Sequence, residues 1–150
     1  MESKVVSRKA ELEDIPGILS IEQACFEEDS FSEQQFTYLI KHAKGAFYVL
    51  VEHDQVVAYV SLLFHSGTRY LRIYSIAVHP EYRGRRLGQC LMERTLQVAQ
   101  ELKAVKVTLE VKESNAPAIA LYMKNGFIPL GIKPHYYHDG SDAVYMQRII

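Results

Sequence analysis

The chain has 150 residues, 48% of them hydrophobic, and its 17 Lys and Arg against 18 Asp and Glu leave a net charge of −1. This length predicts a single domain over residues 1–150. The near-neutral charge argues against direct nucleic-acid binding. The longest apolar stretch, 56–64, is too short to span a membrane. Because the N-terminus lacks the apolar run of a secretory signal, and Cys25 and Cys90 fit neither a disulfide framework nor a CxxC pair, we expect a cytoplasmic protein with reduced thiols.

The first half of the chain predicts a short strand, two helices and three further strands. The strand is Val5–Lys9, and the first helix follows Asp14 and runs through Cys25. Ser32 and Gln35 match the capping box that begins a second helix. Three runs rich in β-branched and aromatic residues then alternate with short turns, which is typical of an antiparallel meander: Ala46–Glu52, Gln55–Phe64 and Tyr70–Val78.

The second half alternates helices with strands. Apolar residues recur every three to four positions from Leu87 to Leu102, which predicts an amphipathic helix, and Ala116–Lys124 is a further helix that Gly126 closes in a left-handed conformation. The strands expected here are Val105–Val111, Phe127–Ile132 and Ala143–Ile149. Strand–helix–strand units imply local parallel pairing. We therefore predict an α+β (mixed α/β) fold with a mostly antiparallel central sheet, one locally parallel pair and about four flanking helices.

Arg83, Arg85 and Arg86 crowd the start of the helix that begins at Leu87. A helix N-terminus already carries about half a positive charge, so cations are disfavoured there. Residues 81–106 hold six Lys and Arg against three acids, a local charge of +3. An anion would explain this placement, because arginines and backbone N–H groups can converge on a phosphate and glycines allow a close approach. A solvated basic turn is the alternative.

The sequence lacks both the glycine- and lysine-containing loop of P-loop proteins and the Gly-x-Gly-x-x-Gly turn of dinucleotide-binding folds. Instead, Arg83-x-x-Arg86-x-Gly88 resembles the pyrophosphate-binding signature of the GNAT acetyltransferases, Gln/Arg-x-x-Gly-x-Gly/Ala, with Arg86 at the middle glycine. Downstream residues are similar to the RimI-type branch of that family, the N-terminal protein acetylases: Glu110, Asn115, Ala118, Tyr122, Phe127, Tyr136, Tyr137, Asp139 and Met146. The resemblance covers most of the chain, is specific from about residue 73 onward, and implies a GNAT-like twisted sheet.

The resemblance also implies that acetyl-CoA is the cosubstrate. Backbone N–H groups at the end of the strand Tyr70–Val78 would hold the oxyanion, and the arginine- and glycine-containing loop would bind the pyrophosphate. Asn115 would contact the pantetheine arm, and it can equally cap the helix that follows. The implied acetyl-CoA contacts are Ile76, Ala77, Val78, Arg83, Gly84, Arg85, Arg86, Leu87, Gly88, Gln89 and Asn115.

Acetyl transfer from a thioester to an amine requires a base for the amine and an acid for the thiolate. Glu110 interrupts an apolar strand and could be the general base, directly or through a water; an ion pair with Lys106 or Lys112 on the same face would explain it as well. Tyr122 stays protonated at pH 7 and could be the general acid; a core tyrosine is the alternative. The resemblance favours the catalytic role for both residues.

An acidic segment lies between the two early helices, at Glu27, Glu28 and Asp29. The GNAT resemblance places this connection beside the acceptor groove, so we expect it to attract a cationic peptide terminus, with Tyr136 and Tyr137 as the opposite wall. A solvated turn is the alternative. RimI-type sequences commonly carry Pro-Trp-Ser in this connection, where this chain has Asp-Ser-Phe-Ser at residues 29–32.

We expect no metal site. His135, His138 and Asp139 have a spacing that suggests ligands, but a fourth ligand is absent nearby and acetyl transfer requires no metal.

The sequence thus predicts an acetyl-CoA-dependent N-acetyltransferase that transfers the acetyl group directly, in a ternary complex, to the N-terminal amine of a protein, with a ribosomal protein as one candidate. The alternatives are a GNAT enzyme that acts on a small-molecule amine or a lysine side chain, a non-catalytic CoA-binding module, and an unrelated anion-binding domain.

Overall fold

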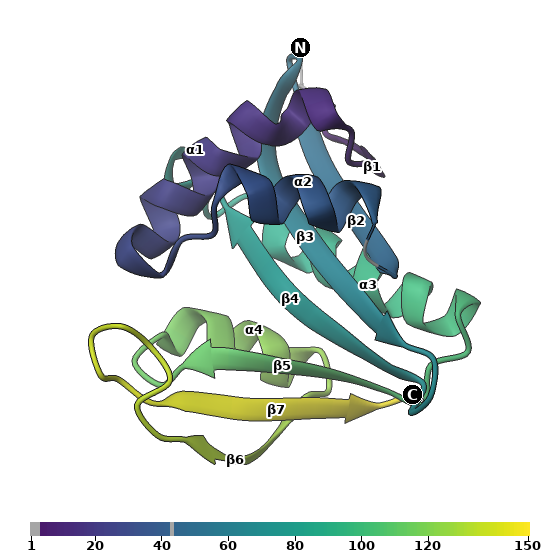
Figure 1. The fold of residues 1–150 in the computed structure, drawn as a ribbon, viewed down its shortest axis with the longest axis vertical. Helices are drawn as coiled ribbons and strands as arrows, with labels where there is room; N and C mark the ends of the chain where they lie inside the picture. Colours follow the sequence, from purple (N-terminus) through teal and green to yellow (C-terminus); the bar gives the residue numbers. More distant parts are fainter. Residues whose placement is uncertain (1–3, 43) are drawn as a thin grey trace.

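The computed structural model describes residues 4–42 and 44–150, except for the side chain of Glu28. In these residues seven strands form one sheet in the order β1-β2-β3-β4-β5-β7-β6 (Figure 1). The strands are β1 (Val6–Lys9), β2 (Gly45–Glu52), β3 (Gln55–His65), β4 (Tyr70–Val78), β5 (Lys106–Lys112), β6 (Ile128–Lys133) and β7 (Ala143–Ile149). The α-helices are α1 (Ile15–Phe26), α2 (Glu33–Lys41), α3 (Leu87–Glu101) and α4 (Ala116–Lys124), and 3-10 turns lie at Leu12–Asp14, Glu27–Asp29 and Pro80–Tyr82.

The predicted fold class is confirmed: β4 and β5 pair in parallel, and the other neighbouring strands described are antiparallel. Helices cover both faces of the sheet, α1 and α2 on one face and α3 and α4 on the other (Figure 1). The larger core lies under α3 and α4 and includes Leu91, Leu109 and Met146, whereas the core under α1 and α2 includes Ile18 and Phe36. Among the described residues, no helix has the length and apolar character that a membrane crossing requires.

Several helix ends lie where their capping residues predict them. Ser32 Oγ accepts the Gln35 N–H (3.2 Å) while Gln35 Oε1 accepts the Ser32 N–H (2.7 Å), which completes the capping box of α2. Asn115 Oδ1 accepts the Ala118 N–H (3.2 Å) at the start of α4, and Gly126 closes that helix with a φ of 87°. Short-range capping chemistry was therefore sufficient to place these boundaries.

Other local expectations need correction. Asp14 precedes α1 as predicted, but its carboxylate pairs with Arg8 (2.7 Å) and makes no side-chain cap. Val105 lies outside β5 and is 45% exposed, and Leu102 follows the end of α3 and is 36% exposed. Cys90 is a free, exposed cysteine on α3.

The parallel pair β4–β5 is short, and the two strands then separate. Pairing joins only Tyr70–Arg72 of β4 to Lys106–Thr108 of β5, after which the strands diverge (Figure 1). The N–H of His79 donates to the Val57 carbonyl on β3 (2.9 Å). Because the bonding direction alternates along a strand, the backbone groups of Ile76 and Val78 point away from β3, on the side of the opening between β4 and β5. The Val78 carbonyl also accepts a hydrogen bond from Cys25 Sγ of α1 (3.5 Å).

A β-bulge in β4 changes which side chains face α1. The register with β3 shifts at Tyr74, which lies between Ile73, opposite Leu62, and Ser75, opposite Ser61. Ile73 belongs to the core under α3, whereas Ser75 contacts a buried carboxylate of α1. The bulge therefore brings a polar side chain under α1.

That carboxylate is Glu22, which is only 1% exposed. Its Oε1 accepts the Phe31 N–H (3.1 Å), and its Oε2 accepts hydrogen bonds from the Tyr59 hydroxyl and from Ser75 Oγ (3.4 Å). Burial raises the pKa of Glu22 from its usual 4.5 to about 7, although the hydrogen bonds from Phe31 and Ser75 oppose the rise. A buried carboxyl group with this pKa makes stability depend on pH.

We expect Glu22→Gln to raise the free energy of unfolding at pH 8, by up to about 3 kcal/mol for a pKa difference of about 2.5. Between pH 4.5 and 7 the unfolded chain has lost the Glu22 proton while the folded chain keeps it, so the wild-type protein loses stability as the pH rises through this window. Glutamine does not titrate, so its advantage should shrink toward pH 4. Thermal unfolding from pH 4 to 8 measures this, with Glu93→Gln on the exposed face of α3 as control. An advantage that does not vary with pH would contradict the prediction.

Candidate active site

The turn between β4 and α3 carries the sequence that resembles the pyrophosphate-binding signature. Gly84 and Arg86 both adopt left-handed conformations, with φ of 79° and 61°. Arg86 thus takes the conformation that the glycine of the signature would adopt at no steric cost. A Cβ at Gly88 would lie 3.0 Å from Leu121 Cδ2, so this glycine allows α3 and α4 to pack closely. The turn leads into the first N–H groups of α3 at Leu87, which lack acceptors within the helix.

The arginines of this turn are less free than the sequence suggests. Arg85 forms a two-point ion pair with Glu52 of β2 (2.5 and 3.1 Å), and the hydrogen bond to Glu52 raises the pKa of Arg85. Arg83 lies 3.4 Å from the Cys25 sulfur, and Arg86 is exposed. The positive charge of Arg85 is therefore balanced by Glu52. Arg83 and Arg86 are left as the cations near the start of α3.

The side chains of two other predicted acetyl-CoA contacts, Gln89 and Asn115, already form hydrogen bonds within the protein. The Gln89 amide exchanges hydrogen bonds with Asn125 (2.8 and 2.9 Å), and Asn115 caps α4. The structure places Gln89 in the first turn of α3 and Asn115 at the start of α4. Gln89 can therefore offer its backbone N–H to a ligand while its side chain holds α3 against the end of α4.

We expect Arg86→Gly to stabilise the protein by about 1 kcal/mol, because glycine removes the cost of a side chain in a left-handed conformation. For a chain of this size that corresponds to roughly 2–4 °C in Tm. The matched control is Arg85→Gly in the same turn, which should lower Tm because Arg85 lacks a positive φ and pairs with Glu52. A decrease in Tm for Arg86→Gly would contradict this account of the turn.

Glu110 lies on β5, on the face opposite the core under α3, and its side chain is 7% exposed. Its partners are Arg72 of β4, with Nη2 3.2 Å from Oε2, and Lys133 of β6, with Nζ 2.6 Å from Oε1. The alternative of an ion pair with Lys106 or Lys112 named the wrong partners: Lys106 donates to Gln147, and Lys112 contacts Asp139. Glu110 is thus a buried carboxylate between two cations, at the edge where β4 and β5 separate.

Tyr122 is 6% exposed on α4, with its ring 6.1 Å from that of Phe127, and burial raises its pKa. Burial raises the pKa of Tyr137, and interactions with Tyr136, Glu110, Asp29 and Tyr122 add to the rise. Tyr137 of the β6–β7 loop therefore lies within electrostatic range of the predicted base on β5, the predicted acid on α4 and Asp29 of the α1–α2 connection.

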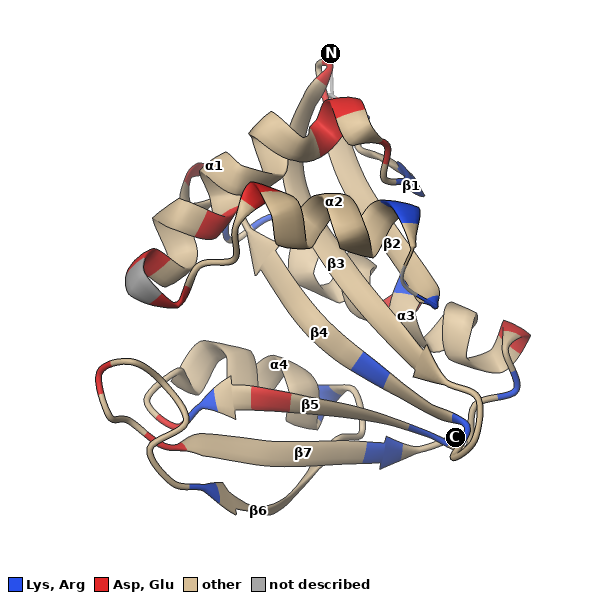
Figure 2. Ribbon diagram, viewed as in Figure 1, with Lys and Arg blue, Asp and Glu red and all other residues tan. Residues whose placement is uncertain are grey.

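The acidic α1–α2 connection contacts the β6–β7 loop directly. Asp29 Oδ1 accepts the His138 N–H (3.0 Å), and Asp29 Oδ2 lies 3.9 Å from Lys112 Nζ, which also pairs with Asp139 (3.1 Å). Acidic residues gather around this connection in Figure 2. Asp29 is therefore a bridge between two loops rather than a free charge. Glu27 is exposed with a φ of 45°, and the side chain of Glu28 lies outside the described residues.

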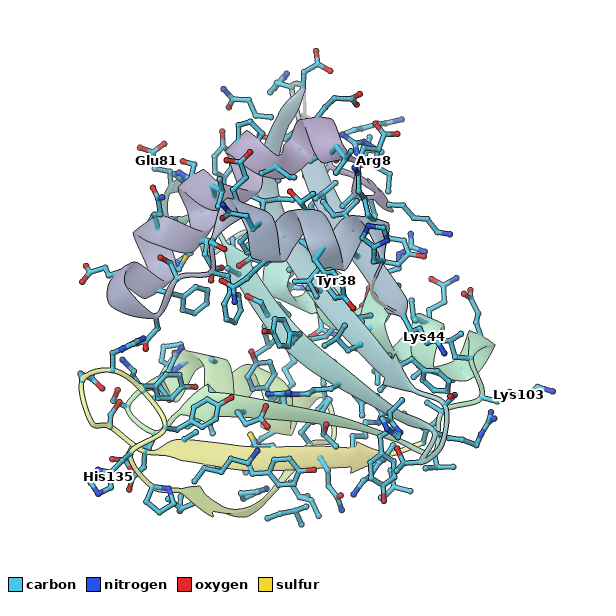
Figure 3. The ribbon with its side chains drawn as sticks, viewed as in Figure 1. Arg8, Tyr38, Lys44, Glu81, Lys103 and His135 are labelled. Carbon is cyan, nitrogen blue, oxygen red and sulfur yellow. The ribbon has the colours of Figure 1, made fainter. Side chains whose placement is uncertain are left out.

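The two histidines of the β6–β7 loop have separate partners. His135 Nδ1 lies 3.2 Å from the Gly140 carbonyl oxygen at the outer end of the loop (Figure 3), while His138 contacts Asp29. Across residues 4–42 and 44–150, no three His, Cys, Asp or Glu residues are grouped so as to hold a metal ion.

The sequence reasoning missed the cations that hold Glu110. Arg72 interrupts the apolar run Tyr70–Val78 just as Glu110 interrupts the next strand, and two opposite charges in adjacent parallel strands are a signal for an ion pair. Lys133 carried no comparable signal, because β6 reaches β5 only through the intervening β7.

The comparisons with known proteins agree with this geometry. Residues 15–127 match the model of the Acetyltransferase (GNAT) family. A Bacillus subtilis protein provisionally named ribosomal protein bS18-alanine N-acetyltransferase is 34% identical over 97% of this chain and 96% of its own. An N-alpha-acetyltransferase of Sulfurisphaera tokodaii is 33% identical over 93% of this chain and 89% of its own.

A solved structure of an N-acetyltransferase is also similar to this chain. The crystal structure of the ribosomal-protein-S18-alanine N-acetyltransferase from Escherichia coli superposes with a TM-score of 0.87 and 28% identity, covering 98% of this chain and 94% of the other. Residues 15–127, which match the family model, contain the turn before α3, Glu110 and Tyr122. With the family model matching most of the chain and a relative at 34% identity along nearly its full length, the protein belongs to the GNAT acetyltransferase family.

Proposed function

We propose that this protein uses acetyl-CoA to acetylate the N-terminal α-amine of a protein in the cytoplasm, with residues 1–150 acting as one domain. A ribosomal protein is the leading acceptor, because similar proteins from Bacillus subtilis and Escherichia coli are named for that substrate. The observation that carries the proposal is the opening between β4 and β5, with the backbone groups of Ile76 and Val78 on one edge and Glu110 on the other.

Acetyl-CoA would bind along β4 and the start of α3. The segment Arg83–Gly88 supplies two cations, two glycines and the first N–H groups of a 15-residue helix, which suit a pyrophosphate. The thioester would then lie beside Ile76–Val78. Asn115 would meet the pantetheine arm through its amide N–H₂ group, because its oxygen caps α4.

In the proposed reaction Glu110 removes a proton from the acceptor ammonium, directly or through a water, through Oε1. Lys133 occupies one side of this oxygen, and a carboxylate oxygen has a second lone pair. The amine attacks the thioester carbon in a ternary complex, and backbone N–H groups of β4 hold the oxyanion. The C–S bond then breaks, the nitrogen releases its remaining extra proton to water, and the Tyr122 hydroxyl gives its proton to the departing thiolate and regains one from water.

The acceptor would approach between the α1–α2 connection and the β6–β7 loop. The Asp29–His138 contact joins these segments, and the Tyr136 and Tyr137 rings of the β6–β7 loop meet edge to face at 5.0 Å. The Tyr136 hydroxyl accepts from Arg72, which also pairs with Glu110. Among the acids of this connection whose side chains the structure describes, Glu27 is left to attract a cationic terminus, because Asp29 is engaged.

Two measurements test this function. Titration calorimetry should show binding of acetyl-CoA and CoA and much weaker binding of ATP, and release of the CoA thiol should depend on a peptide with a free N-terminus. Tighter binding of ATP would favour an unrelated anion-binding domain, and acetyl-CoA binding without thiol release would favour a non-catalytic module.

A further inference from the structure

The buried carboxylate of Glu22 lies outside the proposed chemistry but contacts the segment that borders the acceptor. Its three hydrogen-bond donors come from three places: the hydroxyl of Tyr59 on β3, the hydroxyl of Ser75 on β4, and the backbone N–H of Phe31 at the end of the α1–α2 connection. When Glu22 is ionised its carboxylate only accepts hydrogen bonds, so it then matches three converging donors.

The Phe31 N–H depends most on Glu22. Tyr59 and Ser75 can satisfy each other, because their hydroxyl oxygens are 2.9 Å apart. The Phe31 N–H has no such substitute among its described contacts, and a part-buried N–H without an acceptor is unfavourable. Removing the Glu22 carboxylate should therefore release Phe31 while leaving the pair on the sheet intact.

Phe31 connects Glu22 to the proposed base, Glu110. Its ring stacks on Tyr74, the bulged residue of β4, with ring centroids 4.9 Å apart and planes 16° apart. The Arg72 guanidinium lies 5.5 Å from the Tyr74 ring centroid and pairs with Glu110. A continuous series of contacts thus runs from Glu22 through Phe31, Tyr74 and Arg72 to Glu110.

We propose that Glu22 is a positioning residue for the acceptor: it fixes the Phe31 backbone and thereby holds the α1–α2 connection and the Phe31–Tyr74 stack in place as a wall of the acceptor site. The inference rests on the proposed function, since it takes the acceptor to be a peptide that lies beside this connection.

Steady-state kinetics on Glu22→Leu and Glu22→Gln test the proposal, with acetyl-CoA and an N-terminal peptide as substrates. Leucine fills the space but accepts no hydrogen bond, so the peptide KM should rise about tenfold or more while the acetyl-CoA KM changes less than twofold. Glutamine can still accept from the Phe31 N–H and donate to the hydroxyls, so it should keep the peptide KM within twofold of wild type. Equal effects of the two substitutions on peptide KM, or an equal rise in the acetyl-CoA KM, would overturn the proposal.

Tyr59→Phe is the matched control, because it removes a donor to Glu22 and leaves the Phe31 bond in place. It should not change the peptide KM, whereas a network with only a structural role would make it resemble Glu22→Leu. If Glu22→Leu does not fold, Phe31→Ala against Tyr59→Phe decides: a higher peptide KM only for Phe31→Ala supports the proposal, and equal values overturn it. Absence of wild-type turnover on every peptide would overturn the proposed function and this inference together, whereas wild-type turnover with an unchanged peptide KM in Glu22→Leu overturns the inference alone.

Discussion

Replacing Glu110 with glutamine should lower kcat for peptide acetylation by about 100- to 10,000-fold, the range typical of a lost general base. Glutamine keeps the size of the side chain and can still accept from Arg72 and Lys133, but it cannot take a proton from the acceptor ammonium. It also leaves the two cations without a negative partner at the place where a charged amine must enter. Initial rates of CoA thiol release at saturating acetyl-CoA measure the effect.

The control for this substitution is Glu113→Gln, which changes an exposed acid just beyond the end of β5 and should leave kcat near the wild-type value. Thermal unfolding of both variants shows whether the fold is kept. If Glu110→Gln retained a third or more of the wild-type kcat with an unchanged fold, Glu110 would be a structural ion-pair partner and another group would be the base.

Replacing Tyr122 with phenylalanine should lower kcat by about 100-fold, because the thiolate must then leave without a proton from the enzyme. Burial raises the pKa of Tyr122, so its hydroxyl stays protonated throughout the pH range of an assay. The wild-type rate should therefore show no loss of the acid between pH 6 and 9. Rates at saturating substrates, measured over this range, test both statements.

Tyr38→Phe is a suitable control for the hydroxyl itself, since Tyr38 lies on α2 with its side chain 59% exposed (Figure 3). It should keep the wild-type rate. A wild-type rate in Tyr122→Phe would contradict the acid role and leave Tyr122 as a core residue packed on Phe127.

Local chemistry explains why much of the fold could be predicted from the sequence. The capping box at Ser32, the cap at Asn115 and the left-handed Gly126 each depend on residues within three or four positions, and the observed α2 and α4 begin or end at these places. The antiparallel meander β2–β4 was similarly marked by apolar runs between short turns.

Features that depend on distant residues could not be predicted. Packing between strands sets both the separation of β4 from β5 after Arg72 and the bulge at Tyr74. No residue type at either place indicates these features in the sequence. The alternative of a Glu110 ion pair with Lys106 or Lys112 named the wrong partners for the same reason, since Lys133 follows Glu110 by 23 positions and meets it only through the order of the strands. The resemblance led us to expect Glu27–Asp29 to face Tyr136 and Tyr137 across the acceptor groove, whereas the direct bond of Asp29 to His138 was visible only in the structure.

The position of the acetyl group in the product tests the central claim most directly. A peptide with a free N-terminal alanine and an internal lysine offers both amines to the enzyme at once, and tandem mass spectrometry of the product locates the added group. The account predicts acetylation of the N-terminal α-amine, with the same peptide left unmodified when its N-terminus is blocked. Acetylation of the lysine side chain, or of the blocked peptide, would contradict it.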